Sequence, residues 1–181
     1  MRLFIAVNFD EEFTGYILKI QERLRALAVK GNFSRRGNLH LTLVFLGETS
    51  ADLVPAIRRA ITAIPLSGAF TVEFNRAGFF RHSGKELWYI GAAPGSGNME
   101  RLFQLRTRLV EELAAPSPAG ILSFDRRPFN AHITLGRELR LREELAPFPV
   151  LLKAPIKRIS LMQSEHRDGR LVYTELFGRD L

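Results

Sequence analysis

The sequence predicts an α+β fold with antiparallel sheets, built from two similar halves. Segments with helical spacing of apolar residues alternate with strand-like segments joined by short turns, whereas parallel strands would need more helical crossovers. A short motif also occurs twice, at residues 40–43 and 132–135, which are 92 positions apart in a chain of 181 residues. We therefore expect any chemistry to lie where the two halves meet.

Each copy of the motif has the pattern of a strand with one apolar and one polar face. In the first copy, Leu41 and Leu43 alternate with His40 and Thr42, and residues 132–135 repeat the pattern. Each copy thus places an imidazole and a hydroxyl on one face, about 7 Å apart along the strand. Two such matches arise by chance in roughly one random chain in a thousand, so the repeat indicates function.

The elements of the first half follow from local signals. Asp10 can cap a helix over residues 11–28, because apolar residues recur there at helical spacing. Ser50 or Asp52 can cap a second helix that runs to about Ile64. A basic loop or short strand is expected at 33–38. The strands of this half are expected at 2–9, 39–46, 70–76 and 86–92, with a loop over 78–84.

The second half repeats the order of the first. Residues 94–98 have the most linker-like composition, and we place the crossover between the lobes there. The expected elements are a helix over 99–114, a Pro/Ser/Gly loop through Gly120, the motif strand 130–137, a short acidic and basic helix over 138–145, and a hairpin of strands 156–163 and 171–177 with its turn at 165–170.

The length and composition are those of a globular domain. Hydrophobic residues make up 46% of the chain and charged residues 25%. We expect one domain over residues 1–181, with lobes at approximately 1–94 and 95–181 that can exchange terminal strands. No apolar run approaches the ~20 residues of a membrane span, so no membrane partner is expected. Residues 3–7 have the pattern of a first strand rather than of a signal peptide.

The charge favours an anionic partner. The formal net charge is +7, and the basic residues are 21 Arg and 5 Lys. Arg offers a planar fork that suits phosphate and stacks on bases, so RNA or a nucleotide is the favoured partner and a generally basic surface is the alternative. The absence of Cys excludes disulfides and thiolate chemistry and is compatible with a cytoplasmic location. We expect a monomer.

Two imidazoles that face one cleft can divide acid and base duties. At neutral pH one ring can be neutral and the other protonated, which suits a displacement at phosphorus. The hydroxyls of Thr42 and Thr134 can donate to the non-bridging oxygens, and Arg137 can add a fixed positive charge. A strained 2′,3′-cyclic phosphate is a plausible substrate. A metal site is disfavoured, because the motif faces carry His without Asp or Glu.

The chain resembles the 2H phosphoesterases, which are named for two His-x-Thr/Ser-x motifs, and within them the bacterial and archaeal RNA 2′,3′-cyclic phosphodiesterases, once called 2′-5′ RNA ligases. The resemblance covers nearly the whole chain. It rests on the opening strand, the two signatures and the C-terminal hairpin, at residues 1–7, 38–48, 128–137, 159–164 and Tyr173. Departures from the family pattern are Ala131, where Pro is common, and Phe33, where many members carry Trp.

The resemblance implies a bilobal, pseudo-twofold fold, with antiparallel sheets lining a central cleft and helices outside. It also implies hydrolysis of RNA 2′,3′-cyclic phosphate ends to 2′-phosphomonoesters without metal or other cofactor. By the family mechanism, His132 is the proton acceptor from water and His40 the proton donor to the 3′ oxygen. The sequence itself is symmetric on this assignment.

Two other functions remain open at this point. The same chemistry could serve reversible 2′-5′ ligation of RNA ends or act on small cyclic nucleotides, and a basic RNA-binding module without turnover is the alternative of a different class. Phe33, Arg35 and Phe45 are candidate base or RNA contacts, with core packing or a solvated basic face as the simpler interpretation. His82 and His166 lie in turns and are expected at the exposed surface.

Overall fold

The structure is a computed structural model that describes residues 1–65, 68–92, 99–115, 124 and 128–181. The helices are α1 (Glu11–Leu27), α2 (Val54–Ala63) and α3 (Met99–Ala114), with short 3₁₀ turns at Arg36–Asn38 and Ala51–Leu53. The strands are β1 (Arg2–Asn8), β2 (Ala28–Phe33), β3 (His40–Glu48), β4 (Phe70–His82), β5 (Lys85–Gly91), β6 (His132–Leu141), β7 (Phe148–Ile156), β8 (Arg158–Arg167) and β9 (Arg170–Asp180).

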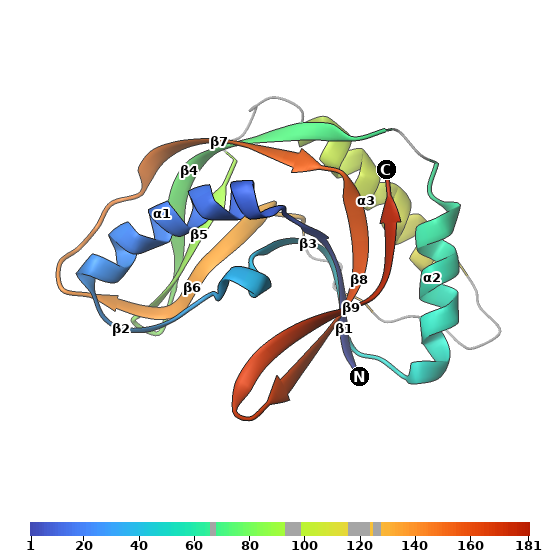
Figure 1. Cartoon of the computed structure of the whole chain (residues 1–181), viewed down its shortest axis with the longest axis horizontal. Helices are drawn as coiled ribbons and strands as arrows, with labels where there is room; N and C mark the ends of the chain where they lie inside the picture. The colour runs from blue at the N-terminus through green and yellow to red at the C-terminus, as the bar shows by residue number, and fades with distance from the viewer. Residues whose placement is uncertain (66–67, 93–98, 116–123, 125–127) are drawn as a thin grey trace.

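The strands form one strongly curved sheet of two groups. The order is β7-β4-β5-β6-β3-β1-β8-β9, with β2 added beside β6, and every pairing is antiparallel. The two groups are joined where β3 meets β6, and Figure 1 shows them as the left and right parts of the molecule. In this order β7, β4, β5 and β6 form one group, and β3, β1, β8 and β9 form the other. Each group thus combines two strands from the first half of the sequence with two from the second, so strands are exchanged between the groups. The lobe boundary near residue 94 stays a prediction.

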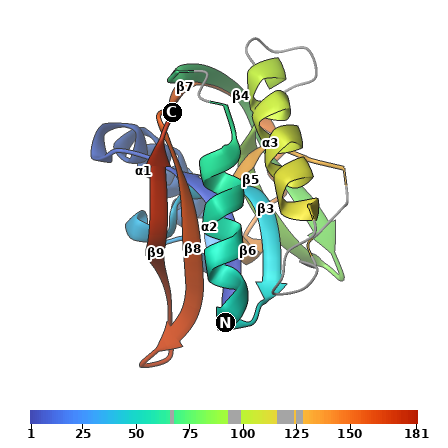
Figure 2. The ribbon, with the colours of Figure 1, turned by 90° about the vertical axis from the view of Figure 1, so that its right-hand side faces the viewer.

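The helices lie outside the sheet, as the predicted α+β class requires. Helix α1 crosses the group that contains β6, whereas α2 and α3 pack against each other on the other side of the molecule (Figures 1 and 2). The cap of α1 is the predicted one, since the Asp10 carboxylate accepts a hydrogen bond of 2.9 Å from the Phe13 amide. None of the helices in the described ranges is both long and apolar enough to span a membrane.

The core runs continuously beneath both groups of strands. Residues 3–7 of β1 are buried on both faces. Leu3, Ile5 and Val7 belong to the main core, whereas Phe4 and Ala6 pack on the other face with Met162 and Tyr173. The side chains of Trp88 and Phe74 are fully buried and fill the other group. A shared core explains why the two groups do not form separate domains.

The predicted loop over residues 78–84 is wrong. Strand β4 continues to His82, and only Ser83 and Gly84 form the turn that leads into β5. The extra length is stabilised by aromatic pairs across the hairpin, between Phe79 and Trp88 at 5.0 Å and between Phe80 and Tyr89 at 4.4 Å. The His82 side chain lies outside the described part of the structure.

The predicted short helix over 138–145 is also wrong, and strand β7 was not expected. Strand β6 continues to Leu141, where it pairs with Ala28 of β2. Leu139 is buried against Gly31 of β2, so partners more than a hundred residues away decide the conformation. The expected linker at 94–98 and the loop through Gly120 lie outside the described residues.

Two glycines give opposite expectations for stability. Gly31 has φ +152°, and an added Cβ would meet the Leu139 side chain and lie 3.0 Å from its Cα, whereas Gly15 in α1 has no atom nearby. We expect Gly31→Ala to lose ~1–3 kcal/mol of unfolding free energy. The matched change Gly15→Ala should gain about 0.5–1 kcal/mol. Urea unfolding of both variants checks this, and equal effects would contradict the assigned close approach.

Candidate active site

The two motif strands lie side by side in the sheet. Strands β3 and β6 are antiparallel and pair through Leu41 and Ile133. Continuing that register sets the His of each motif opposite the Thr of the other, in the pairs His40–Thr134 and His132–Thr42. Cβ atoms at opposed positions are about 4.5–5.5 Å apart. The four predicted groups therefore lie around a local twofold axis that passes through the Leu41–Ile133 pair.

Both motif strands contain a β-bulge at the residue after the Thr. In β3 the extra residue is Leu43, and in β6 it is Leu135, because the neighbouring strands skip them in the pairs Ala6–Thr42, Ile5–Val44, Tyr89–Thr134 and Trp88–Gly136. An extra residue reverses the alternation of side chains beyond it. It turns Phe45 and Arg137, each five residues after a motif His, away from the core side and leaves them exposed.

Backbone carbonyls fix the orientation of both imidazoles. The Nδ1 atoms of His40 and His132 lie 2.7 Å from the carbonyl oxygens of Asn38 and Asn130, each two residues earlier. A carbonyl oxygen can only accept, so each Nδ1 carries a proton, and in the neutral ring each Nε2 is an acceptor. In His40 this Nε2 lies 3.0 Å from the Thr42 hydroxyl, which donates to the neutral ring.

His40 is the more enclosed of the two rings. Phe4 packs at 4.9 Å and Tyr173 at 5.2 Å between ring centroids. Burial lowers the pKa of His40 to about 4, and the charges of Arg137 and His132 act in the same direction, against the bond to the Asn38 carbonyl. The free protein therefore holds His40 neutral at neutral pH.

His132 has a similar but more open environment. Its ring meets Phe80 and Tyr89 edge-on, at 5.9 and 5.7 Å. Burial lowers the pKa of His132, and the Arg137 charge adds to the effect, whereas the Asn130 carbonyl opposes it. Both imidazoles are thus shifted towards the neutral form before any anion binds.

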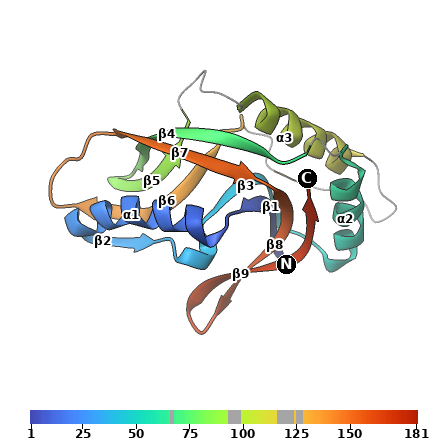
Figure 3. The same ribbon diagram turned by 45° about the horizontal axis from the view of Figure 1, so that its top comes forward.

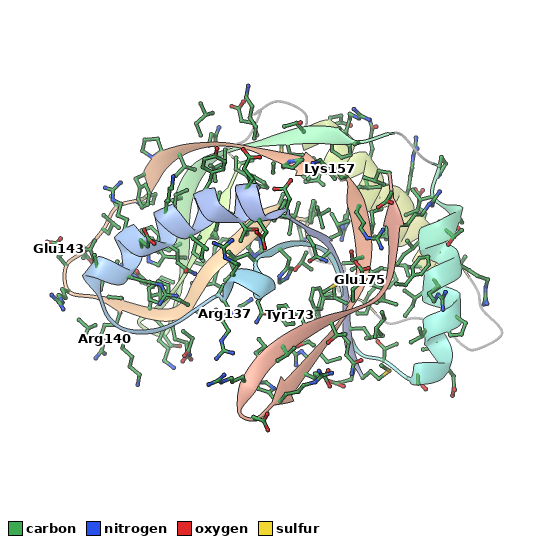
Figure 4. The ribbon with its side chains drawn as sticks, viewed as in Figure 1. Arg137, Arg140, Glu143, Lys157, Tyr173 and Glu175 are labelled. Atoms are coloured by element: carbon green, nitrogen blue, oxygen red, sulfur yellow. The ribbon has the colours of Figure 1, made fainter. Side chains whose placement is uncertain are left out.

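A cavity of about 750 Å³ opens on the His40 side of the motif strands. It brings together five of the predicted site residues, which are Phe33, Arg35, His40, Thr134 and Arg137. Figure 4 shows Arg137 and Tyr173 beside each other at this cavity, from β6 and β9. The sequence interpretation did not assign a site role to Tyr173; its place in the C-terminal signature was the available signal.

The cavity is positively charged. Arg35, Arg137 and Arg170 line it, and in the part of the chain that the structure describes none of them forms an ion pair. His166 is exposed, as expected, and also lines the cavity, near the end of the β8–β9 hairpin that projects from the molecule (Figure 3). An anionic ligand fits this lining better than a neutral one.

A smaller groove of about 290 Å³ lies beyond the Leu41–Ile133 pair, on the His132 side of the motif strands. It contains the remaining predicted residues Thr42, Phe45 and His132, together with Phe129 and Arg106. The local twofold relation thus divides the site, with Arg137 on one side and Phe45 at the equivalent place on the other. Among the described residues, no three His, Asp or Glu side chains are grouped as for a metal ion.

Comparison with known proteins agrees with this geometry. The model of the 2′-5′ RNA ligase superfamily matches residues 17–168. An RNA 2′,3′-cyclic phosphodiesterase of Thermus thermophilus is 30% identical over 186 residues, covering 97% of this chain and 88% of that protein. The Escherichia coli protein of the same name is 30% identical over 178 residues, covering 97% and 93%.

Solved structures give the same result. The crystal structure of Escherichia coli LigT complexed with 3′-AMP has a TM-score of 0.79 at 28% identity and covers 99% of this chain and 97% of that one. The structure of TT0787 of Thermus thermophilus has a TM-score of 0.74 at 26% identity, covering 100% and 98%. The predicted family and fold class are confirmed, and the chain belongs to the 2′-5′ RNA ligase superfamily of 2H phosphoesterases.

Proposed function

We propose that the chain is an RNA 2′,3′-cyclic phosphodiesterase, which hydrolyses cyclic phosphate ends to 2′-phosphomonoesters. The observation that carries the proposal is the register of β3 and β6, which sets each motif His opposite the Thr of the other strand. The basic cavity on the His40 side suits the phosphates of an RNA end. The relatives' names favour hydrolysis over ligation or a non-catalytic RNA-binding role.

In the proposed mechanism His132 acts on the attacking water and His40 on the leaving oxygen. The Nε2 atom of His132 takes a proton from water as its oxygen bonds to phosphorus. The bond from phosphorus to the 3′ oxygen breaks, and the protonated Nε2 of His40 gives that oxygen its proton. The 2′ ester bond stays intact, so the products are a 2′-phosphate and a free 3′ hydroxyl. The carbonyls of Asn38 and Asn130 support both roles, because they keep each Nδ1 protonated throughout.

Substrate binding favours the protonated form of His40, which the role of proton donor requires. In the free protein, burial and Arg137 hold the pKa of His40 well below its ordinary value. A phosphate anion between the two rings neutralises the field of Arg137 and favours a protonated His40. Protonation also removes the acceptor from Nε2, which frees the Thr42 hydroxyl to donate to a non-bridging oxygen. Thr134 and Arg137 complete the proposed phosphate contacts.

Phe33, Arg35 and Phe45 are the proposed contacts to the nucleotide and the RNA chain. Arg25 covers one face of Phe33 at 4.2 Å, so a base can stack only on the other face. Phe45 is 36% exposed and lies in the smaller groove beside His132. Arg35 suits an RNA phosphate. A cytoplasmic location and a monomeric state belong to the same proposal, and the Cys-free sequence is compatible with the location.

The direct test is turnover of a nucleoside 2′,3′-cyclic phosphate with chelator present. We expect 2′-monophosphate as product and a loss of ~10²–10⁴ in kcat for His40→Ala and for His132→Ala, because each removes a proton-transfer group. Circular dichroism and the melting temperature report whether each variant remains folded. A folded variant with near wild-type turnover would refute the two-histidine mechanism.

The pH dependence follows from the direction of the two pKa shifts. The active free enzyme needs one neutral and one protonated imidazole, so kcat/KM should be bell-shaped, with limbs that belong to the coupled pair. Both pKa values are lowered, His40 to about 4, so the optimum of kcat/KM should lie below pH 6.5. Arg137→Gln should move the basic limb to higher pH, since it removes a repelling charge. Rates that rise steadily from pH 5 to 9 would instead indicate hydroxide as the nucleophile.

The hydroxyls should matter mainly in the transition state. Thr42→Val and Thr134→Val keep the branched shape and delete the donor, so each should lower kcat by roughly 10- to 1000-fold. Thr71→Val on β4, outside both cavities, is the matched control and should leave kcat unchanged. Arg137→Lys should retain more activity than Arg137→Ala, because it keeps the charge and loses the fork. Single-turnover kinetics separate these effects from binding, and a change in KM alone would make the hydroxyls ground-state contacts.

A further inference from the structure

The bulge at Leu135 lies between the two phosphate contacts that β6 is proposed to supply. Thr134 precedes the bulged residue and Arg137 follows it by two positions. Regular alternation would direct Thr134 and Arg137 to opposite faces of the strand, so both reach one cavity only because the bulge is present. A bulge interrupts the ladder and leaves backbone groups that need other partners. What holds the Leu135 bulge therefore decides where the phosphate contacts point.

Gln21 of helix α1 supplies part of that support. Its side chain is 1% exposed, and its Nε2 donates to the carbonyl of Leu135 at 2.8 Å and to the carbonyl of Ser34 at 2.7 Å. Its Oε1 accepts from Arg25 at 3.2 Å. All hydrogen-bonding positions of the amide other than one lone pair are thus used, which fixes its rotamer. A buried amide with these partners has little freedom to move.

Ser34, the residue directly after β2, contacts Leu135 as well and adds a bond to Thr134. Its hydroxyl donates to the carbonyl of Thr134 at 2.7 Å, and its amide donates to the carbonyl of Leu135 at 2.9 Å. Gln21 in turn binds the Ser34 carbonyl. Thr134, Leu135 and the start of the basic loop are thereby joined to α1.

The amide at this place is exceptional among the buried helix positions. The buried residues of α2 and α3 are all apolar, and those of α1 are apolar apart from Thr14 and Gln21. Thr14 is used within its own helix turn, since its hydroxyl donates to the Asp10 carbonyl at 2.7 Å. Packing alone does not require an amide at position 21, because Leu or Met has a similar volume. The hydrogen bonds to the bulge are its distinguishing contribution.

We propose that Gln21, together with Ser34, is a positioning residue that holds the Leu135 bulge and so directs Thr134 and Arg137 at one phosphate. The inference rests on the proposed phosphodiesterase function and deepens it. Gln21 lines neither cavity, whereas Ser34 lies in the wall of the larger one, and the positioning effect needs no contact of either side chain with the substrate. Their effect passes through the backbone of residues 134–136, where a displacement of about 1 Å can cost a hundredfold in rate.

The first test compares Gln21→Leu with the control Thr14→Val. Both remove a buried polar contact of α1, but only the first contact reaches β6. On a cyclic mononucleotide we expect Gln21→Leu to lower kcat about ten- to a hundredfold with little change in KM, and Thr14→Val to change neither by more than about twofold. Ser34→Ala should lower kcat less, and Ser34→Thr should restore it because it keeps the hydroxyl. Equal kcat values for Gln21→Leu and Thr14→Val would overturn the proposal.

A double-mutant cycle tests through which residue Gln21 acts. Combined with Thr134→Val, Gln21→Leu should add less than its separate effect, because one of the two groups that it positions is already gone. Combined with Thr42→Val, whose strand lacks this contact, the two losses should multiply. Equal behaviour with both Thr variants would show a general loss of structure and contradict a positioning role.

The amide NMR spectrum separates failure of this inference from failure of the proposed function. Gln21→Leu should shift the amide signals of Leu135, Gly136 and Arg137, and Thr14→Val should not. If the wild-type protein has no turnover but these shifts occur, the bulge support stands and the phosphodiesterase proposal fails. If turnover is normal and the signals stay in place in folded Gln21→Leu, the positioning inference is refuted and the function remains.

Discussion

The whole site depends on the antiparallel contact between β3 and β6. Leu41 and Ile133 lie at the centre of that contact and are fully buried, so the hydrophobic effect locks the register from the core side. On the cleft side the same register sets His opposite Thr twice. The other strands extend the sheet from this seam, and the helices cover its outer faces (Figure 2). A slip of one residue would bury the imidazoles and expose the aliphatic side chains.

The parts of the structure that the sequence predicts are those with a local cause. The spacing of apolar residues predicts α1 and α3 to within a residue or two, and alternation predicts the motif strands. The conformation of residues 138–145 depends on pairing with β2, which no local pattern reveals. The same holds for the bulges at Leu43 and Leu135, because an extra residue exists only relative to a neighbouring strand. The sequence therefore predicts which groups share the cleft, and not the turn of the backbone that brings Arg137 to join them.

The motif strands β3 and β6 are related by a local twofold axis but carry different side chains at equivalent positions. Each bulge directs the fifth residue after a motif His towards the cleft, and that residue is Arg137 in one strand and Phe45 in the other. The backbone geometry is shared, so the difference between a charged cavity and an aromatic groove arises from side chains alone. A symmetric pair of imidazoles with different surroundings can in this way bind an asymmetric ligand in one direction.

The exchange of strands has a consequence for biosynthesis. β1 lies between β3 and β8, and Ile5 pairs with both Val44 and Leu161. Translation delivers the N-terminal strand long before its second neighbour, since domains emerge at about 5–20 residues per second. Until then one edge of an almost wholly apolar strand stays open, which is the kind of surface that chaperones bind and that seeds aggregation. The nascent chain therefore cannot complete its core before the last hairpin has left the ribosome.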